Sequence, residues 1–315
     1  MMRQFDTPGA VRLVARNAIG AISVVARSSA TTEVQVRALD RRAEERAALT
    51  RIDCKEESGE YRVTVDVPAP EGRSWPGNHE VEVHVGVPED AYLELTGASA
   101  DLFAQGRFRG GKLQTASGDI EVDHASGDAS AATVSGDVAV AQADGSLKIR
   151  TAKGDISVRL ASGQLMLESE SGDIEVGASE REARLHTASG DIQVGSLAGT
   201  LDAATASGDL TLREARGECR IASRSGDVEV ESVREGKLDI ETMSGDVQIG
   251  VSPGSRVSVD TETRTGDLRS RIPLAAEPAV DESDAASPLV SLKIRTMTGD
   301  VSIARSRRLS ASVNR

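Results

Sequence analysis

The sequence predicts an all-β fold: a parallel β-solenoid of about eleven two-strand coils of 18 residues, preceded by an N-terminal β-rich cap. Three observations predict this fold. A glycine-aspartate step recurs at fixed spacing, small aliphatic residues alternate with polar ones, and a Thr or Ser stands three residues before each repeated glycine. Repetition at a fixed period is typical of a stacked array, in which each unit buries its apolar face against its neighbours.

A small residue followed by Gly-Asp marks one turn of each coil. The first seven of these glycines are 18 residues apart, and the later steps are 19, 21 and 33 residues. The repeated glycines are Gly118, Gly136, Gly154, Gly172, Gly190, Gly208, Gly226, Gly245, Gly266 and Gly299. A second glycine falls halfway round most coils, at Gly127, Gly145, Gly163, Gly199, Gly217, Gly236 and Gly254. Because Gly and Asp favour tight turns, each coil is expected to turn twice.

The apolar residues within a coil alternate with a period of two, which is the strand signal. In the coil around Gly190, Ile192 and Val194 follow the glycine by two and four residues. Ala183 and Leu185 precede the glycine by seven and five residues, and Thr187 shares their parity. The Thr/Ser column is therefore expected inside the coil, with hydroxyls bonded between coils. These inward positions are not multiples of six, which argues against the left-handed hexapeptide helix that an 18-residue coil also allows.

Residues 1–92 depart from the repeat and predict the cap, apart from one repeat-like coil at residues 13–24. A short helix is expected over Arg41–Leu49, with Asp40 as its N-cap. The cap would shield the open end of the solenoid from edge pairing. Three further alternating runs predict strands at Glu33–Leu39, Tyr61–Val67 and Glu80–Val87.

The solenoid itself is predicted over residues 93–304. An acidic stretch rich in Ala and Pro, residues 272–288, explains the 33-residue step and predicts a loop insertion. The last repeat, residues 292–303, is then expected to end the solenoid. Residues 305–315 carry four Arg and predict a disordered basic tail, whose charge discourages edge pairing at that end.

With its repeated T-x-S-G-D-[IVL]-x-V signature, as in residues 187–194 (TASGDIQV), the chain resembles a bacterial β-strand-repeat family of candidate adhesins, also described as toastrack domains. The resemblance covers residues 13–24 and about 93–303. It implies a β-solenoid of unknown biochemical role, with links to the cell envelope and to envelope-stress modules. It implies no catalytic residues.

The Asp after each repeated glycine forms a column along the solenoid. Neighbouring carboxylates would repel by about 1 kcal/mol even at a water-like dielectric, so each is predicted to accept backbone N–H groups of its own turn. The alternative is a cation ladder, because carboxylate oxygens bind Ca²⁺. The ladder residues would be Asp119, Asp137, Asp155, Asp173, Asp191, Asp209 and Asp227. Unlike calcium β-rolls, the repeat has Asp at one turn only, so no metal is expected.

Composition excludes several classes of partner. The net charge of −13 argues against nucleic acid and anionic membranes. All six aromatic residues lie before residue 109, so the solenoid body has no stacking platform for sugars, and a sugar site would lie near Trp75 or on the cap. Cys54 and Cys219 are predicted to be reduced packing residues, without a CxxC context.

No catalytic constellation is apparent in the sequence. The histidines form no pair at metal-ligand spacing, and there is no nucleophile elbow, phosphate loop or dinucleotide fingerprint. The chain is therefore expected not to be an enzyme and to bind no cofactor. A polysaccharide-acting β-helix enzyme stays as a further alternative, because such enzymes cluster acidic residues along a groove. The four histidines are His79, His84, His124 and His186.

We therefore expect a non-catalytic binding or scaffolding solenoid with unidentified protein partners, present as a monomer or small homo-oligomer. The alternative function is a structural filament, in which solenoid ends stack head to tail. No apolar run is long enough to span a membrane, and residues 1–20 lack the apolar core of a signal peptide. A cytoplasmic location without membrane insertion is expected.

Overall fold

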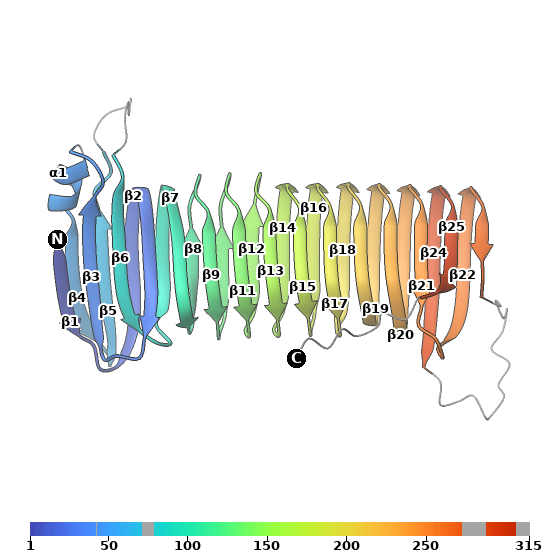
Figure 1. Ribbon diagram of the computed structural model, residues 1–315, viewed down its shortest axis with the longest axis horizontal. Coiled ribbons are helices and arrows are strands. Elements are labelled where there is room, and N and C mark those ends of the chain that lie inside the picture. Colours follow the sequence, from blue (N-terminus) through green and yellow to red (C-terminus); the bar gives the residue numbers. More distant parts are fainter. Residues whose placement is uncertain (42, 71–78, 273–287, 307–315) are drawn as a thin grey trace, which may run out of the picture. The chain divides into compact units, whose positions relative to one another are not determined.

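The computed structural model describes residues 1–41, 43–70, 79–272 and 288–306, and strands make up most of them (Figure 1). The predicted all-β solenoid is confirmed. The chain forms two compact units, Met1–Ser169 and Glu170–Arg315, and each is described below on its own. Within the described ranges no helix is long and apolar enough to cross a membrane.

The first unit contains the short helix α1 (Ala43–Ala48) and the strands β1 to β14. Their bounds are β1 (Met2–Asp6), β2 (Ala10–Arg27), β3 (Thr31–Ala38), β4 (Arg51–Glu57), β5 (Glu60–Val67), β6 (Val81–Pro88), β7 (Tyr92–Phe108), β8 (Gly110–Gln114), β9 (Ile120–Ala125), β10 (Ala129–Ala132), β11 (Val138–Ala143), β12 (Leu147–Thr151), β13 (Ile156–Ala161) and β14 (Leu165–Ser171).

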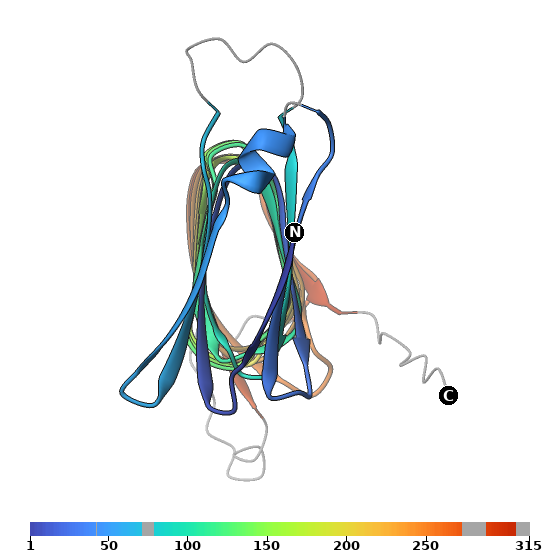
Figure 2. The same cartoon turned by 90° about the vertical axis from the view of Figure 1, so that its left-hand side faces the viewer.

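From β7 onward the first unit consists of stacked coils, which Figure 2 shows end-on as a flattened ring. Each strand pairs in parallel with the strand one repeat later, as β9, β11 and β13 do through Ile120, Val138 and Ile156. These three side chains are buried, each 1% exposed. The 18-residue repeat therefore sets both the register and the core, as the alternation predicts.

At the N-terminal end the order of the strands in space differs from their order in the sequence. Strand β2 pairs in parallel with β7 on one edge and with β5 and β6 on the other. The coil formed by β5 and β6 therefore lies outside the coil formed by β2. Beyond it, β4 pairs antiparallel with β5, and β3 pairs antiparallel with β6 and β1.

Helix α1 sits against this end through one buried arginine. Asp40 is the N-cap, since its Oδ1 accepts the N–H of Ala43 at 2.9 Å. Arg46, only 5% exposed, donates to the carbonyl oxygens of Pro68 and His79 and to Oδ1 of Asn17. Burial lowers the pKa of Arg46, and these oxygens satisfy its guanidinium. Trp75, one of the two places predicted for a sugar site, lies outside the described residues.

The second unit contains the strands β15 to β25. Their bounds are β15 (Ile174–Ser179), β16 (Ala183–Ser189), β17 (Ile192–Leu197), β18 (Thr200–Ser207), β19 (Leu210–Ser225), β20 (Val228–Ser244), β21 (Val247–Val251), β22 (Arg256–Thr265), β23 (Leu268–Ser270), β24 (Leu289–Thr298) and β25 (Val301–Arg305). Up to β21 the parallel pairing follows the order of the sequence.

The last two coils of the second unit exchange places. Strand β24 lies between β20 and β22, and β25 lies between β21 and β23. The coil of residues 256–270 therefore ends the stack, and the expectation that residues 292–303 end it is wrong. The predicted loop 272–288 and basic tail 305–315 fall mostly outside the described residues, which stop at 272 and resume for 288–306.

The Thr/Ser column is buried inside the coils, as predicted from its parity. In six coils its hydroxyl donates to a carbonyl one coil earlier, as from Thr151 to Gly136 at 3.3 Å. The prediction of bonds between coils is wrong for the last four. Within the described residues no hydrogen-bond partner reaches the buried hydroxyls of Ser223, Thr242, Thr263 and Thr296.

Candidate functional site

The aspartate column forms a ladder of hydrogen bonds between coils. The Oδ1 atom of Asp191 accepts the backbone N–H of Asp209, at 2.8 Å, and the same contact recurs at 2.7 to 3.0 Å in both units. The predicted contact with the N–H groups of each aspartate's own turn is wrong. The carboxylate reaches along the stack because the N–H of the next aspartate, one coil later, points back toward it.

This ladder bears on the proposed cation sites. One oxygen of Asp119, Asp137, Asp173, Asp191, Asp209 and Asp227 already accepts an N–H group. Nowhere in the described ranges do three or more His, Cys, Asp or Glu side chains come close enough together to hold a metal ion. The cation ladder, which also includes Asp155, stays a prediction.

The histidines are spread over the surface of the first unit and the second. His124 contacts Asp144, with 2.7 Å between Nε2 and Oδ2, and His84 contacts Glu82 at 3.4 Å. A hydrogen bond from Gln142 and a second from His124 lower the pKa of Asp144. In the described part of the chain no hydroxyl or thiol is hydrogen-bonded to an imidazole, so no nucleophile is paired with a base.

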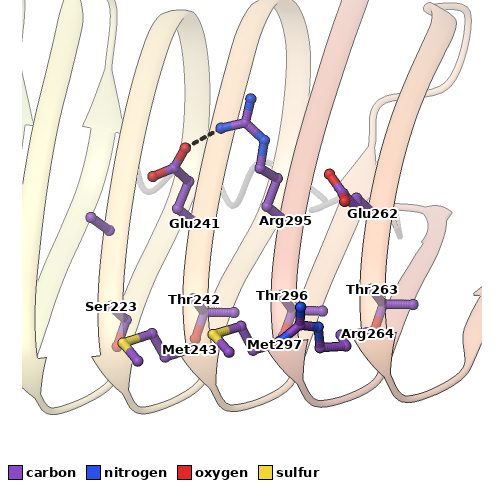
Figure 3. Close-up of a pocket in the computed structure, with 11 residues that line it drawn as sticks. Ser223, Glu241, Thr242, Met243, Glu262, Thr263, Arg264, Arg295, Thr296 and Met297 are labelled. Carbon is purple, nitrogen blue, oxygen red and sulfur yellow. Dashed lines mark hydrogen bonds and ion pairs between the residues drawn. The ribbon is translucent and has the colours of Figure 1, made fainter.

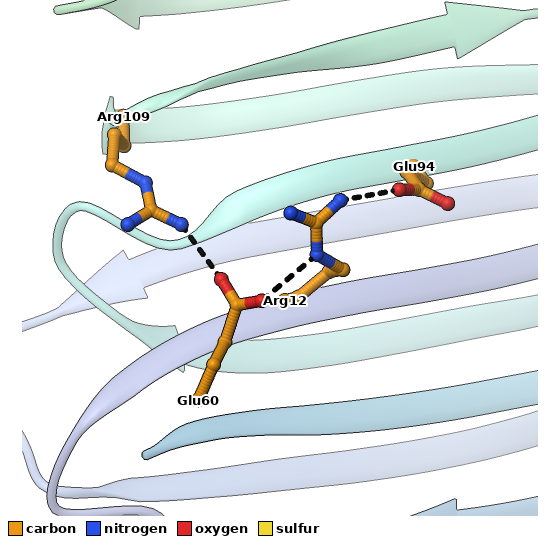
Figure 4. Close-up of polar contacts among 4 residues, drawn as sticks. All are labelled: Arg12, Glu60, Glu94 and Arg109. Carbon is orange, nitrogen blue, oxygen red and sulfur yellow. Dashed lines mark hydrogen bonds and ion pairs between the residues drawn. The ribbon is translucent and has the colours of Figure 1, made fainter. Parts of the chain in front are cut away.

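A charged cluster crosses three neighbouring strands of the first unit (Figure 4). Arg12 on β2 donates to Glu60 on β5 at 3.1 Å and to Glu94 on β7 at 2.7 Å. Arg109 donates to the other oxygen of Glu60 at 2.8 Å, and Arg12 stacks over the ring of Tyr92 at 4.5 Å. The hydrogen bonds raise the pKa of Arg12 and lower that of Glu60. Each charge already has a partner, so the cluster joins strands.

The second unit carries an outer groove over the strands β19, β20, β24 and β22 (Figure 3). Its volume is about 830 Å³. The backbone along Ser223, Thr242, Thr296 and Thr263 forms its floor, because these residues lie side by side in the parallel register and turn their side chains into the core. The residues on either side of each Thr point outward and form its two walls.

One wall of the groove is charged, and the other is mainly apolar. Glu241, Arg295 and Glu262 form the charged wall, in which Arg295 donates to Glu241. Met243 and Met297 lie side by side in the other wall, 51% and 44% exposed. Arg264 continues that wall on the end strand. In the described ranges neither Glu262 nor Arg264 forms an ion pair, so two opposite charges lie on the end strand β22, beside the methionines.

Sequence reasoning missed this groove. In the repeat, the residue after the column Thr is often Ala, as at Ala188 and Ala206, whereas Met243 and Met297 stand there in the last coils. That substitution was a usable signal. The contact between Glu241 and Arg295 could not be predicted from the sequence. These residues are 54 positions apart and meet only because the last two coils exchange places.

The arrangement is suited to binding rather than to bond chemistry. Methionine side chains adapt to irregular apolar partners, and an exposed apolar strip flanked by charges is typical of an interaction surface. The charges would fix the orientation of a bound partner, because Glu262 and the Arg264 guanidinium lie on opposite sides of the floor.

The chain matches one sequence family over most of its length. The sequence model of the family described as Toastrack DUF4097 matches residues 11–184 and 144–304. No curated protein sequence matches the chain. A candidate cell adhesion protein from Clostridium sporogenes ATCC 15579 is 9% identical with a TM-score of 0.27, covering 97% of this chain and 99% of that chain. A candidate adhesin from Bacteroides fragilis NCTC 9343 is 12% identical with a TM-score of 0.29, covering 96% of each chain.

Proposed function

This chain belongs to the Toastrack DUF4097 family, and we propose that it is a non-catalytic binding module whose outer groove on β20, β24 and β22 holds an extended segment of a partner protein. The observation that carries the proposal is the pair of exposed methionines, Met243 and Met297, beside two opposite charges that form no ion pair within the described residues. An exposed apolar strip of this kind lowers the solubility of a protein unless a partner covers it.

The walls of the groove specify the chemistry of the partner. An apolar side chain of the partner would cover Met243 and Met297. A basic residue would pair with Glu262, and an acidic residue would pair with Arg264. The groove is long enough for several residues of an extended chain, because it crosses four neighbouring strands that are about 4.8 Å apart. A uniformly acidic segment would leave Glu262 unpaired, and an uncharged segment would leave both wall charges unpaired.

The absence of a nucleophile paired with a base in the described residues supports a non-catalytic role. The acidic ladder supports it too. Its carboxylates hold the coils together through N–H groups, which leaves them poorly placed to transfer protons to a substrate.

A displayed library of random linear peptides, selected against the full chain, tests the proposal. We expect selected peptides to contain an apolar residue together with a basic and an acidic one. Replacing both methionines by serine (M243S/M297S) should weaken their binding by tenfold or more, or about 1.4 kcal/mol. The matched control A188S/A206S changes the same repeat position in two other coils and should leave binding unchanged.

A charge exchange provides the second arm of this test. The variant E262R/R264E reverses both wall charges while keeping the net charge of the chain. Peptides selected against it should carry their basic and acidic residues in the reverse order. Failure to select any peptide, or equal binding to M243S/M297S and to the unmodified chain, would overturn the proposal.

A further inference from the structure

The end coil of the second unit, residues 256–270, has a free strand edge. Strand β22 pairs with β24 on one side, and β23 pairs with β25. On their other sides neither strand has a partner strand in the described part of the chain. An unpaired strand of ten residues exposes a row of N–H and C=O groups that can pair with another chain.

The core of this end coil is only partly covered. Val257 and Val259 on β22 are half-buried, whereas their register partners Val290 and Leu292 on β24 are at most 1% exposed. Leu268 on β23 is 43% exposed, whereas its partner Val301 is fully buried. An additional coil stacked on this end would bury these side chains as the other coils bury theirs.

The hydrogen-bond ladder also stops at this edge. The N–H of Asp267 donates to Oδ1 of Asp300 at 2.9 Å, but among the described residues no N–H of a following coil reaches the carboxylate of Asp267. Arg269 contacts it instead at 3.3 Å, with both side chains at least 70% exposed. One coil inward, the N–H groups of Gly299 and Val301 donate to the oxygens of Thr265 and Asp267.

The edge carries few of the devices that prevent strand pairing. The inward positions of β22 hold Val257, Val259, Thr261 and Thr263, and none is charged. The strand contains no proline and has no bulge in its register with β24. Edge strands that stay unpaired usually have charged side chains, a proline or a bulge, and of these devices β22 has only outward-facing charges, of both signs.

We propose that a second copy of this chain covers the end coil, with β22 of the two copies paired antiparallel about a two-fold axis. The outward residues of β22 fit such a self-pairing. Placing Arg264 opposite Asp260 of the other copy creates two opposite-charge pairs. In this register Glu262 lies opposite Glu262 of the other copy at the axis. The Arg264 side chain of the other copy then lies diagonal to each Glu262.

A two-fold interface of this kind closes after two copies. It therefore differs from the head-to-tail filament, in which each copy would use both of its ends and the assembly would keep growing. Arg264 belongs both to this interface and to the wall of the proposed groove, but Asp260 does not line the groove and dimerisation requires no peptide, so the two proposals can fail separately.

Light scattering coupled to size exclusion, over a wide range of protein concentration and without ligand, tests the inference. The expected mass is twice the 33.0 kDa of one chain. The single variants D260R and R264D place like charges opposite each other and should each give a monomer. The double variant D260R/R264D restores opposite pairs and should restore the dimer. The control R213D changes an exposed charge on β19, away from the edge, and should remain a dimer.

Several outcomes would overturn the inference. A monomer at every concentration would do so, and so would a mass that grows without limit. A dimer that both single variants retain would place the contact elsewhere. Monomeric single variants without rescue in the double variant would refute the antiparallel register. Circular dichroism and melting of each variant separate the loss of the dimer from the loss of the fold.

Discussion

The backbone N–H of Asp209 donates a hydrogen bond to the carboxylate of Asp191, 18 residues earlier, with 2.8 Å between N and Oδ1. The contact ties two successive coils together at their turn. Because each aspartate both donates its N–H and accepts the next one, a row of carboxylates that would otherwise repel becomes part of the stacking interaction. The repeated Asp is therefore explained by the coil interface.

Replacing Asp209 by alanine should lower the free energy of unfolding by about 1 kcal/mol, since the N–H of Asp227 loses its acceptor at an exposed position where water competes. Asp209→Asn keeps an acceptor oxygen and removes one charge, so its stability should match that of the unmodified chain. Urea unfolding measures both. Equal loss in the two variants would show that charge, and not hydrogen bonding, is what the column supplies.

The two kinds of buried threonine should respond differently to Thr→Val. Thr151 donates to the carbonyl of Gly136 and accepts the N–H of Gly154, so Thr151→Val should cost about 1–3 kcal/mol. Thr242→Val should be neutral or stabilising, because the Thr242 hydroxyl is buried with no hydrogen-bond partner in the described residues. The two residues are equally buried, at 7% and 5% exposed, which makes each the control for the other. A large loss in Thr242→Val would contradict the assignment.

The turn glycines are required by the close approach of successive coils. A Cβ on Gly154 would lie 1.8 Å from the carbonyl oxygen of Gly136, so Gly154→Ala should destabilise by about 3 kcal/mol. Gly86→Ala is the matched control. Its Cβ would meet only the guanidinium of Arg27, at 3.4 Å, and that flexible side chain can move. Its stability should change by less than about 1 kcal/mol in thermal or urea unfolding. Similar losses in the two variants would argue against tight stacking.

Cys219 should make the stability depend on alkaline pH. Burial raises the pKa of its thiol from an ordinary 9.0 to about 12, and the side chain is 2% exposed. The raised pKa means that the thiol's contribution is complete below pH 9 and is lost as the pH rises toward 12, because only the unfolded chain ionises in that window.

At pH 10 the loss should be about 1.4 kcal/mol relative to pH 8. Cys219→Val removes this titration, so the difference in unfolding free energy between the two proteins should change with pH by that amount. In the folded protein Cys219 should also resist alkylation, which mass spectrometry can follow. A constant difference across this range would mean that the thiol is not buried.

The repeat made most of the coil predictable, because period and parity fix which residues lie at turns and which lie inside. The position of Thr187 in phase with Leu185 is enough to place it in the core. The same pattern did not reveal where the Asp side chain reaches. A turn residue has acceptable N–H partners both in its own turn and in the next coil, and spacing alone does not separate them.

The order of the coils was not predictable for a related reason. Parallel coils with the same turn motif present nearly the same edge, so β24 can pair equally well with β20 and with β22. Nothing in the sequence marks that choice. The groove depends on it, because Met243 meets Met297 and Glu241 meets Arg295 only when β24 enters between its neighbours.

Paired cysteines test the exchange of the last two coils most directly. Residues 241 and 295 are register partners on adjacent strands, within the roughly 4.4–6.8 Å between Cα atoms that a disulfide tolerates. The double variant E241C/R295C should therefore form a disulfide under mild oxidation, identified by mass spectrometry of the linked peptides. E241C/E262C should not, because β24 separates these residues. A disulfide in E241C/E262C and none in E241C/R295C would mean that the coils stack in sequence order, and the groove as described would not exist.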